Sequence, residues 1–296
     1  MISLQQILPL TQSQLFHFLC KYYRGNYIAS KKNFILVKGV APVLLVAHLD
    51  TVHAEPVKQT CASVDGNILM SPQGIGGDDR CGIYALNKIY EMSAVKPFLL
   101  FTCNEEVGGI GAKVFCNCLR DKFLASLCNS FKLIIEIDRK GNNDAVYYDC
   151  VNPNFENYIL SKGFKTALGS FSDISLIAPA LGVAAVNLSA GYYNPHTLHE
   201  FINLQELNST INRVVDIIAD SVKDDFPKFQ YLEHYAFAGY WDDYAFENEP
   251  VPCEYEQIYS ELLELYTAEE LEELRHVYGN QVLQELYFND FCKDEK

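Results

Sequence analysis

The sequence predicts an α/β fold, a three-layer sandwich with a mixed, centrally parallel sheet, followed by a mainly helical acidic C-terminal extension. Two patterns predict it. Five short apolar segments, rich in Val, Ile, Leu or Phe, have the length and composition of strands buried on both faces: residues 34–37, 43–47, 98–102, 133–137 and 183–188. Segments with helical spacing lie between several of these strands, which is typical of a sheet whose central strands are parallel.

The expected helices follow in chain order. Residues 2–23 place apolar side chains at helical spacing, and Pro9 marks a start or a kink in that helix. Further helical patterns cover residues 82–92, 112–127, 155–160 and 174–178, and the long amphipathic stretch 204–222. No internal repeat is present.

The overall composition excludes several classes of protein. Hydrophobic residues make up 49% and charged residues 21% of the chain, which is ordinary for a globular protein and unlike a disordered or collagen-like one. No apolar run reaches the roughly 18 residues that a membrane helix needs. The N-terminus lacks the basic start and continuous apolar stretch of a secretory signal, so we expect a cytoplasmic protein. Its 10 cysteines are then expected to be free thiols.

The last quarter of the chain differs in charge from the rest. Residues 230–296 hold 17 acidic and 3 basic residues, a net charge of −14, which leaves −1 for residues 1–229. We therefore expect a catalytic domain over 1–229 and an acidic, aromatic-rich extension over 230–296. Thr267 and Glu270 fit a capping box that opens one of the extension's helices, and Gly279 fits its end.

The negative charge of this extension argues against nucleic acid and anionic membranes as partners, because both would repel it. Its aromatic residues are expected to pack against the body, with the acidic faces in solvent. The alternatives are control of access to a site, self-association, or binding of a protein partner.

Histidines and carboxylates follow the predicted strands at the points where those strands end, and two more carboxylates follow a glycine-rich turn. In chain order they are His48 and Asp50, Asp78 and Asp79, Glu105 and Glu106, Asp138, and His196. The carboxyl ends of parallel strands share one edge of a sheet, where sites form. Imidazole and carboxylate ligands suit zinc, manganese or cobalt, and a shared carboxylate can bridge two ions. The sequence therefore predicts a metal site at this edge.

The order of these motifs resembles a known family. The chain reads HLDTV, then GGDDRCG, then NEEVGG, then an Asp after IIEI, then NPHTLHE. This order is similar to that of the co-catalytic di-zinc exopeptidases, which include the leucyl aminopeptidases and, locally, peptidase T. The resemblance covers about residues 25–222 and is specific in the combination and order of its motifs.

The resemblance implies a role for each of these side chains. Two zinc ions are implied, with manganese or cobalt as alternatives. One ion would be held by His48 and Asp138 and the other by Glu106 and His196, while Asp78 would bridge both.

Three further roles are implied around these ligands. Glu105 would act as the general base that takes a proton from the attacking water. Asp50 would accept a hydrogen bond from the second imidazole nitrogen of His48. The peptide bond from Asp78 to Asp79 is often cis in this family.

Two assignments have alternatives: the histidine ligand of the second ion and the residues of the substrate pocket. The His-x-x-His spacing leaves His199 as a rival to His196, although the family pattern favours His196. Ser172 and Asp173 fit a helix N-cap, and the resemblance adds a role in a substrate pocket as an alternative. Tyr192 and Tyr193 are also expected to line that pocket because they precede His196 closely.

The spacing of the motifs narrows the function that the resemblance implies. Only 27 residues separate Asp50 from Asp78, and only 57 separate Asp138 from His196. These segments are too short for the inserted or lid domains of larger relatives. We therefore expect a compact aminopeptidase acting on short peptides. The alternatives are an N-acyl-amino-acid amidohydrolase with the same site, and a catalytically inactive binding module that uses the acidic extension.

Overall fold

The computed structural model describes residues 2–233, 262, 271 and 283. The chain divides into two compact units, Met1–His234 and Tyr235–Lys296. The helices expected within residues 230–296, including the one opened by Thr267, lie outside the described residues. The architecture below is that of the first unit.

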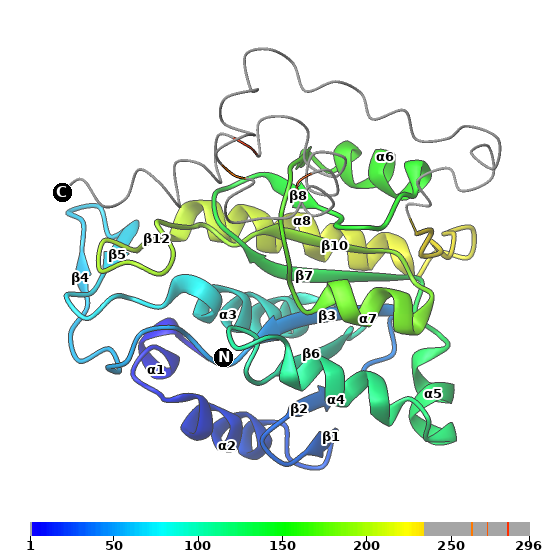
Figure 1. Cartoon of the computed structure of the whole chain (residues 1–296), viewed down its shortest axis with the longest axis horizontal. Helices are drawn as coiled ribbons and strands as arrows, with labels where there is room; N and C mark the ends of the chain where they lie inside the picture. The colour runs from blue at the N-terminus through cyan, green and yellow to red at the C-terminus, as the bar shows by residue number, and fades with distance from the viewer. Residues whose placement is uncertain (1, 234–261, 263–270, 272–282, 284–296) are drawn as a thin grey trace. The chain divides into compact units, whose positions relative to one another are not determined.

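An eight-stranded mixed sheet forms the middle layer of this unit (Figure 1). Its strands, in spatial order, are β1 (Tyr27–Ser30), β2 (Phe34–Val37), β6 (Phe98–Thr102), β3 (Val43–His48), β7 (Leu133–Arg139), β10 (Ala185–Ser189), β8 (Asp144–Val146) and β9 (Lys165–Thr166). The four central strands, from β6 to β10, run parallel, while β2 and β8 pair antiparallel with them. The predicted α/β fold with a mixed, centrally parallel sheet is confirmed.

Helices cover both faces of this sheet. Helices α3 (Gly77–Met92) and α8 (Leu204–Ser221) pack on one face, and α4 (Ile110–Cys118) and α7 (Ile174–Leu181) on the other. Alternate residues of β3 face opposite layers: Leu45 joins the core with α3 and α8, whereas Leu44 joins the core with α4 and α7. Because both faces are buried, every residue of β3 is apolar until His48.

The remaining helices differ from the predicted ones at breaks that local capping explains. The predicted helix over 2–23 is two helices, α1 (Leu4–Ile7) and α2 (Gln12–Tyr22), because Thr11 caps α2 by accepting the backbone N–H of Gln14. The predicted helix over 112–127 is also two, α4 and α5 (Lys122–Cys128). Asp121 caps α5, accepting the N–H groups of Phe123 and Leu124. Helix α6 covers Pro153–Ser161.

A second, four-stranded sheet has no counterpart in the sequence prediction. It joins β11 (Tyr192–Tyr193), β12 (Phe201–Asn203), β5 (Ile68–Met70) and β4 (Cys61–Ala62) in antiparallel order. Strands of two or three residues are too short to show the alternation that identifies a strand in sequence. The loop between β11 and β12 carries His196, so this small sheet fixes the position of that side chain.

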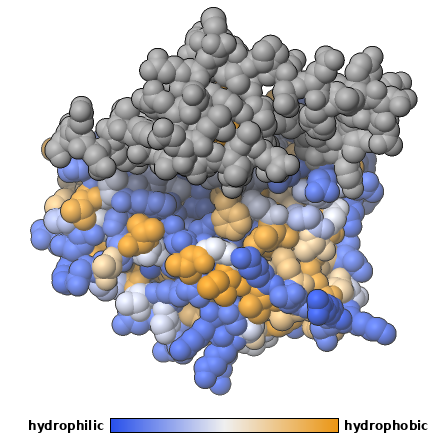
Figure 2. Space-filling view, viewed as in Figure 1, coloured by the Kyte–Doolittle hydropathy of each residue, from blue (hydrophilic) through white to orange (hydrophobic). Residues whose placement is uncertain are grey.

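The outer surface of the described unit mixes hydrophilic and hydrophobic residues, as Figure 2 shows for one face. No helix among the described residues combines the length and the apolarity that crossing a membrane requires.

Candidate metal centre

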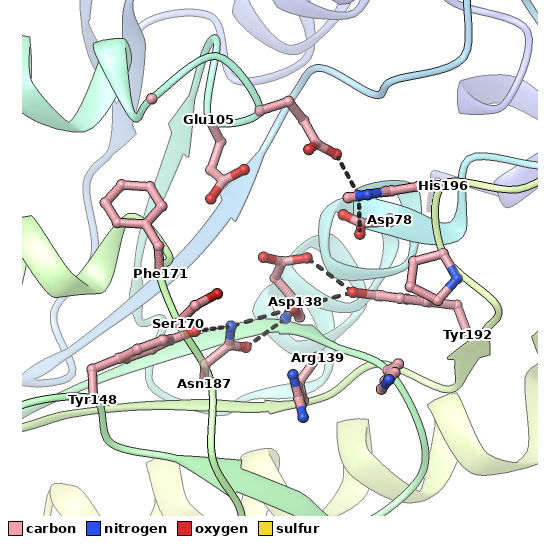
Figure 3. A pocket seen from close by; sticks show the side chains of 15 residues that line it. Asp78, Glu105, Asp138, Arg139, Tyr148, Ser170, Phe171, Asn187, Tyr192 and His196 are labelled. Atoms are coloured by element: carbon pink, nitrogen blue, oxygen red, sulfur yellow. Dashed lines mark hydrogen bonds and ion pairs between the residues drawn. The ribbon is translucent and has the colours of Figure 1, made fainter. Parts of the chain in front are cut away.

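A cavity of about 360 Å³ opens where the central parallel strands end (Figure 3). The side chains that line it include Asp78 from the start of α3, Glu105 and Glu106 from the loop after β6, Asp138 from β7, and His196. The edge of the sheet therefore brings together the carboxylates that stand far apart in the sequence, as expected for parallel strands.

His48 ends β3 and is completely buried. Its Nε2 lies 3.1 Å from Asp78 Oδ1 and 3.7 Å from Asp138 Oδ1. Its Nδ1 lies 3.3 Å from Asp50 Oδ1. Asp50 also accepts the backbone N–H groups of Glu105, at 3.0 Å, and Glu106, at 3.1 Å. One carboxylate thus contacts both the imidazole and the loop that carries the two glutamates.

The other oxygen of Asp78 faces the second histidine. His196 Nε2 lies 3.2 Å from Asp78 Oδ2 and 3.2 Å from Glu106 Oε1. His196 is half exposed and has a positive φ of 63°, which the β11–β12 loop imposes. One carboxylate oxygen of Asp78 therefore faces the imidazole of His48, and the other faces that of His196.

These side chains form sets of ligand atoms within 4.8 Å of one another. One set is His48, Asp78 and Asp138; another is Asp78, Glu106 and His196; a third joins His48 to Glu105 and Glu106. Within the described part of the chain, Glu106 Oε1 is buried and makes no hydrogen bond, although His196 Nε2 lies 3.2 Å away. A buried carboxylate oxygen of this kind is costly unless a cation, either a metal ion or an imidazolium, faces it. The residues present therefore fit metal ions, and Asp78 belongs to two of the sets.

The electrostatics of this cluster reflect an excess of carboxylates. Burial, together with the charge of Asp78, raises the pKa of Asp138 well above its usual value. Burial likewise raises the pKa of Glu106, and it raises that of Glu105 to about 7. Although burial opposes it, hydrogen bonding to His196 and His48 lowers the pKa of Asp78. Cations at this place would relieve the repulsion among these carboxylates.

Asp79 follows a cis peptide bond from Asp78, as the family resemblance implies. Its carboxylate is fully buried and accepts the backbone N–H of His48 at 3.2 Å and that of Gly82 at 2.8 Å. Asp79 therefore links the end of β3 to the first turns of α3.

Two residues that support the site were missed in the sequence. Glu200 is fully buried and accepts the backbone N–H groups of Asp78, at 2.9 Å, and Gly76, at 3.0 Å. His53 Nε2 lies 2.8 Å from Glu200 Oε2. Both stand beside quoted motifs, His53 just after HLDTV and Glu200 at the end of NPHTLHE. The sequence signal for these two residues was a histidine directly after one ligand motif and an acidic residue at the end of another.

Two predicted pocket residues do not line the cavity. Ser172 and Asp173 are fully buried. The Ser172 hydroxyl donates to Glu136, and Asp173 accepts from the Thr102 hydroxyl. Asp173 occupies the N-cap position of α7 but makes no side-chain capping bond. Burial raises its pKa to about 6. The residues just before this pair, Ser170 and Phe171, line the cavity instead.

Of the two tyrosines and the two histidines considered for this pocket, one of each lines the cavity. Tyr192 lines the cavity, and its hydroxyl donates to the backbone carbonyl of Asp138 at 3.2 Å. Tyr193 is not among the lining residues; its hydroxyl donates to Glu206 at 2.6 Å. His199 is exposed and belongs to none of the three ligand sets among the described residues, unlike His196.

The raised pKa of Glu105 leads to a stability prediction for the metal-free protein. A carboxyl whose pKa rises from 4.5 to about 7 on folding binds its proton more tightly in the folded state, so its contribution to stability is lost as pH rises towards 7. Glu105→Gln should leave the unfolding free energy unchanged near pH 4 and raise it at pH 8 by about 1–2 kcal/mol, after allowance for partial exposure.

Equilibrium urea unfolding in a chelator at both pH values measures this difference. The control is Glu55→Gln, an exposed carboxylate paired with Lys58, which should give no gain at pH 8. A Glu105→Gln variant that is no more stable than the wild type at pH 8 would contradict the raised pKa.

Comparisons with known proteins give the fold. No protein-family model and no curated protein matches the sequence. Among solved structures, a tripeptidase from Staphylococcus aureus matches with a TM-score of 0.56 and 16% identity, over 74% of this chain and 95% of the tripeptidase.

Two further structures agree with that match. Aminopeptidase PepT from Bacillus cereus matches with a TM-score of 0.57 and 14% identity, over 74% of this chain and 96% of its own. The third match is the TET1 peptidase of Pyrococcus horikoshii, which can assemble into a tetrahedron or a large octahedral shell. It matches with a TM-score of 0.52 and 13% identity, over 73% of this chain and 98% of the TET1 peptidase. The chain therefore has the fold of these three peptidase structures, which confirms the fold that the resemblance implies.

Proposed function

We propose that this protein is a metal-dependent exopeptidase, an aminopeptidase that removes N-terminal residues from short peptides. The observation that carries the proposal is the position of Asp78, whose two oxygens face His48 and His196. A carboxylate between two imidazoles, each with a further carboxylate beside it, offers ligands to two ions that would share it. The shared exopeptidase fold supports the same assignment.

We propose zinc as the bound metal, with manganese or cobalt as alternatives, because imidazole and carboxylate ligands suit these ions. His48 and Asp138 would hold one ion, Glu106 and His196 the other, and Asp78 both. When bound, the ions supply a polarised scissile carbonyl and a water of lowered pKa.

Glu105 is the general base in this proposal. It lines the cavity beside both ligand sets without being needed in either, so its carboxylate is free to take and return a proton. It would accept the proton of the attacking water and pass it to the nitrogen of the leaving amine.

Asp50 is a positioning residue in this mechanism. Its carboxylate lies beside Nδ1 of His48, which keeps the Nε2 lone pair directed at the cavity. Because the same carboxylate accepts the N–H groups of Glu105 and Glu106, it also sets where the base stands relative to His48.

The proposed substrate size follows from the cavity and from what surrounds it. A volume of about 360 Å³ is near the lower end for small-molecule sites, which favours a short peptide. The chain between Asp138 and His196 forms β8, α6, β9, α7, β10 and β11, all within the first unit, and contains no separate lid.

Glu105→Gln should reduce kcat on aminoacyl anilides and tripeptides by about 10²–10⁴-fold, the usual contribution of a general base. Its KM and its metal content should stay close to those of the wild type, because the ligand sets with Asp138 and His196 remain. Steady-state kinetics and elemental analysis of the same preparations measure both.

The control is again Glu55→Gln, which should keep full activity. Activity that survives Glu105→Gln intact would contradict the mechanism. A wild type that prefers N-acetylated over free-amine substrates would be an N-acyl-amino-acid amidohydrolase. A folded wild type without bound metal or activity would favour a binding module.

We also propose that residues 1–229 are the catalytic domain and that residues 230–296 are an extension that catalysis does not need. The charge of the extension, −14, sets it apart from the neutral body. A chain that lacks residues 230–296 should keep its kcat, and a change in its oligomer size, which gel filtration with light scattering can measure, would assign self-association to the extension. Unchanged oligomer size and unchanged kinetics would leave only a packing or solubility role.

A further inference from the structure

The cavity of the metal centre has two basic side chains to which the mechanism gives no role. Arg139, the last residue of β7, and Lys140, in the turn that follows, line the cavity together with the carboxylates. Figure 3 shows Arg139 on the opposite side of Asp138 from Glu105. Apart from His196, these are the basic residues of the lining, so the cavity is acidic around Asp78 and basic beyond Asp138.

Lys140 combines a fixed backbone with a free side chain. Its carbonyl accepts the hydroxyl of Ser189 at 2.9 Å, and the next residue, Gly141, donates its N–H to the carbonyl of Tyr192 at 2.9 Å. Within the described residues, the Lys140 ammonium is exposed and has no hydrogen-bond or ion-pair partner. A lysine held in this way at the edge of a cavity can bind an anionic group without first breaking a contact.

Arg139 is held more firmly. Its Nη2 donates to the carbonyl of Leu168 at 3.0 Å, and its Nε lies 3.6 Å from Asp144 Oδ2. The segment that follows Leu168 supplies Gly169 and Phe171 to the cavity wall. Arg139 therefore positions this wall, and it adds positive charge beside Lys140.

We propose that Lys140, supported by the charge of Arg139, binds the C-terminal carboxylate of the substrate and makes the enzyme selective for short peptides with a free C-terminus. This inference rests on the proposed peptidase function. A short peptide carries its carboxylate a few residues from the bond to be cut, and the cavity of about 360 Å³ places both basic residues in the same space as Glu105. A carboxylate bound by an ammonium gains the attraction between opposite charges, which a neutral carboxamide lacks.

The test compares Leu-Gly-Gly with its C-terminal amide. The wild type should cleave the free acid about tenfold more efficiently, with the difference in KM, in line with a hydrogen bond to a charged group. Lys140→Gln should remove this preference by raising KM for the free acid, and circular dichroism should show that the variant is folded. Lys140→Arg should keep the preference. Lys165→Gln, an exposed lysine outside the cavity lining, is the matched control and should behave as the wild type.

Binding gives a second readout that does not depend on turnover. In calorimetry with the metal-loaded Glu105→Gln variant, the acid should bind about tenfold more tightly than the amide, and the difference should shrink at high salt. When Lys140→Gln is added to this variant, the difference in affinity between acid and amide should disappear.

Equal cleavage of acid and amide by the wild type, or a preference that survives Lys140→Gln, would overturn the role of Lys140 and leave the proposed function standing. If the wild type cleaved neither peptide, the proposed function would be wrong, and the calorimetric comparison would still decide whether Lys140 binds the carboxylate.

Discussion

The site depends on one buried carboxylate being held between two imidazoles. Asp78 is nine-tenths buried, and its oxygens lie 3.1 Å from His48 Nε2 and 3.2 Å from His196 Nε2. A carboxylate in such a place needs partners on both oxygens, because burial alone would favour its neutral form. Glu200 fixes the backbone on which Asp78 stands, through the N–H groups of Asp78 and Gly76. Each of the other proposed ligands, His48, Asp138, Glu106 and His196, shares a set of close ligand atoms with this carboxylate.

The fold meets this requirement by bringing three distant segments to one edge. His48 is delivered by the central strand β3, Asp138 by its neighbour β7, and His196 by a loop clamped in the small second sheet. Asp50 then connects His48 to the N–H groups of Glu105 and Glu106. A shift of the loop after β6 would therefore move the base and a ligand together, relative to the rest of the cluster.

Sequence reasoning works here where a physical signal is local. Five of the eight strands of the main sheet were predictable because burial on both faces demands continuous apolar runs. The residues at the ends of three of those runs, His48, Glu105 with Glu106, and Asp138, meet at the site. The second sheet was not predictable, because strands as short as Tyr192–Tyr193 carry no periodicity.

The pocket lining was predicted only in part, for a different reason. Ser172 and Asp173 point into the core because their partners, Glu136 and Thr102, stand 36 and 71 residues away on β7 and β6, and no local pattern reveals such pairs. Lys140 could not be singled out either, since an exposed lysine in a turn looks the same in sequence whether or not a cavity lies beside it.

The most direct test of the bridged site is the metal content per chain after zinc reconstitution, for the wild type and for Asp78→Ala. We expect about two zinc ions per chain in the wild type and the loss of most of this zinc in the variant, because Asp78 belongs to both ligand sets. Circular dichroism confirms that each preparation is folded. A folded wild type that binds no metal, or an Asp78→Ala variant that retains two ions, would contradict the account.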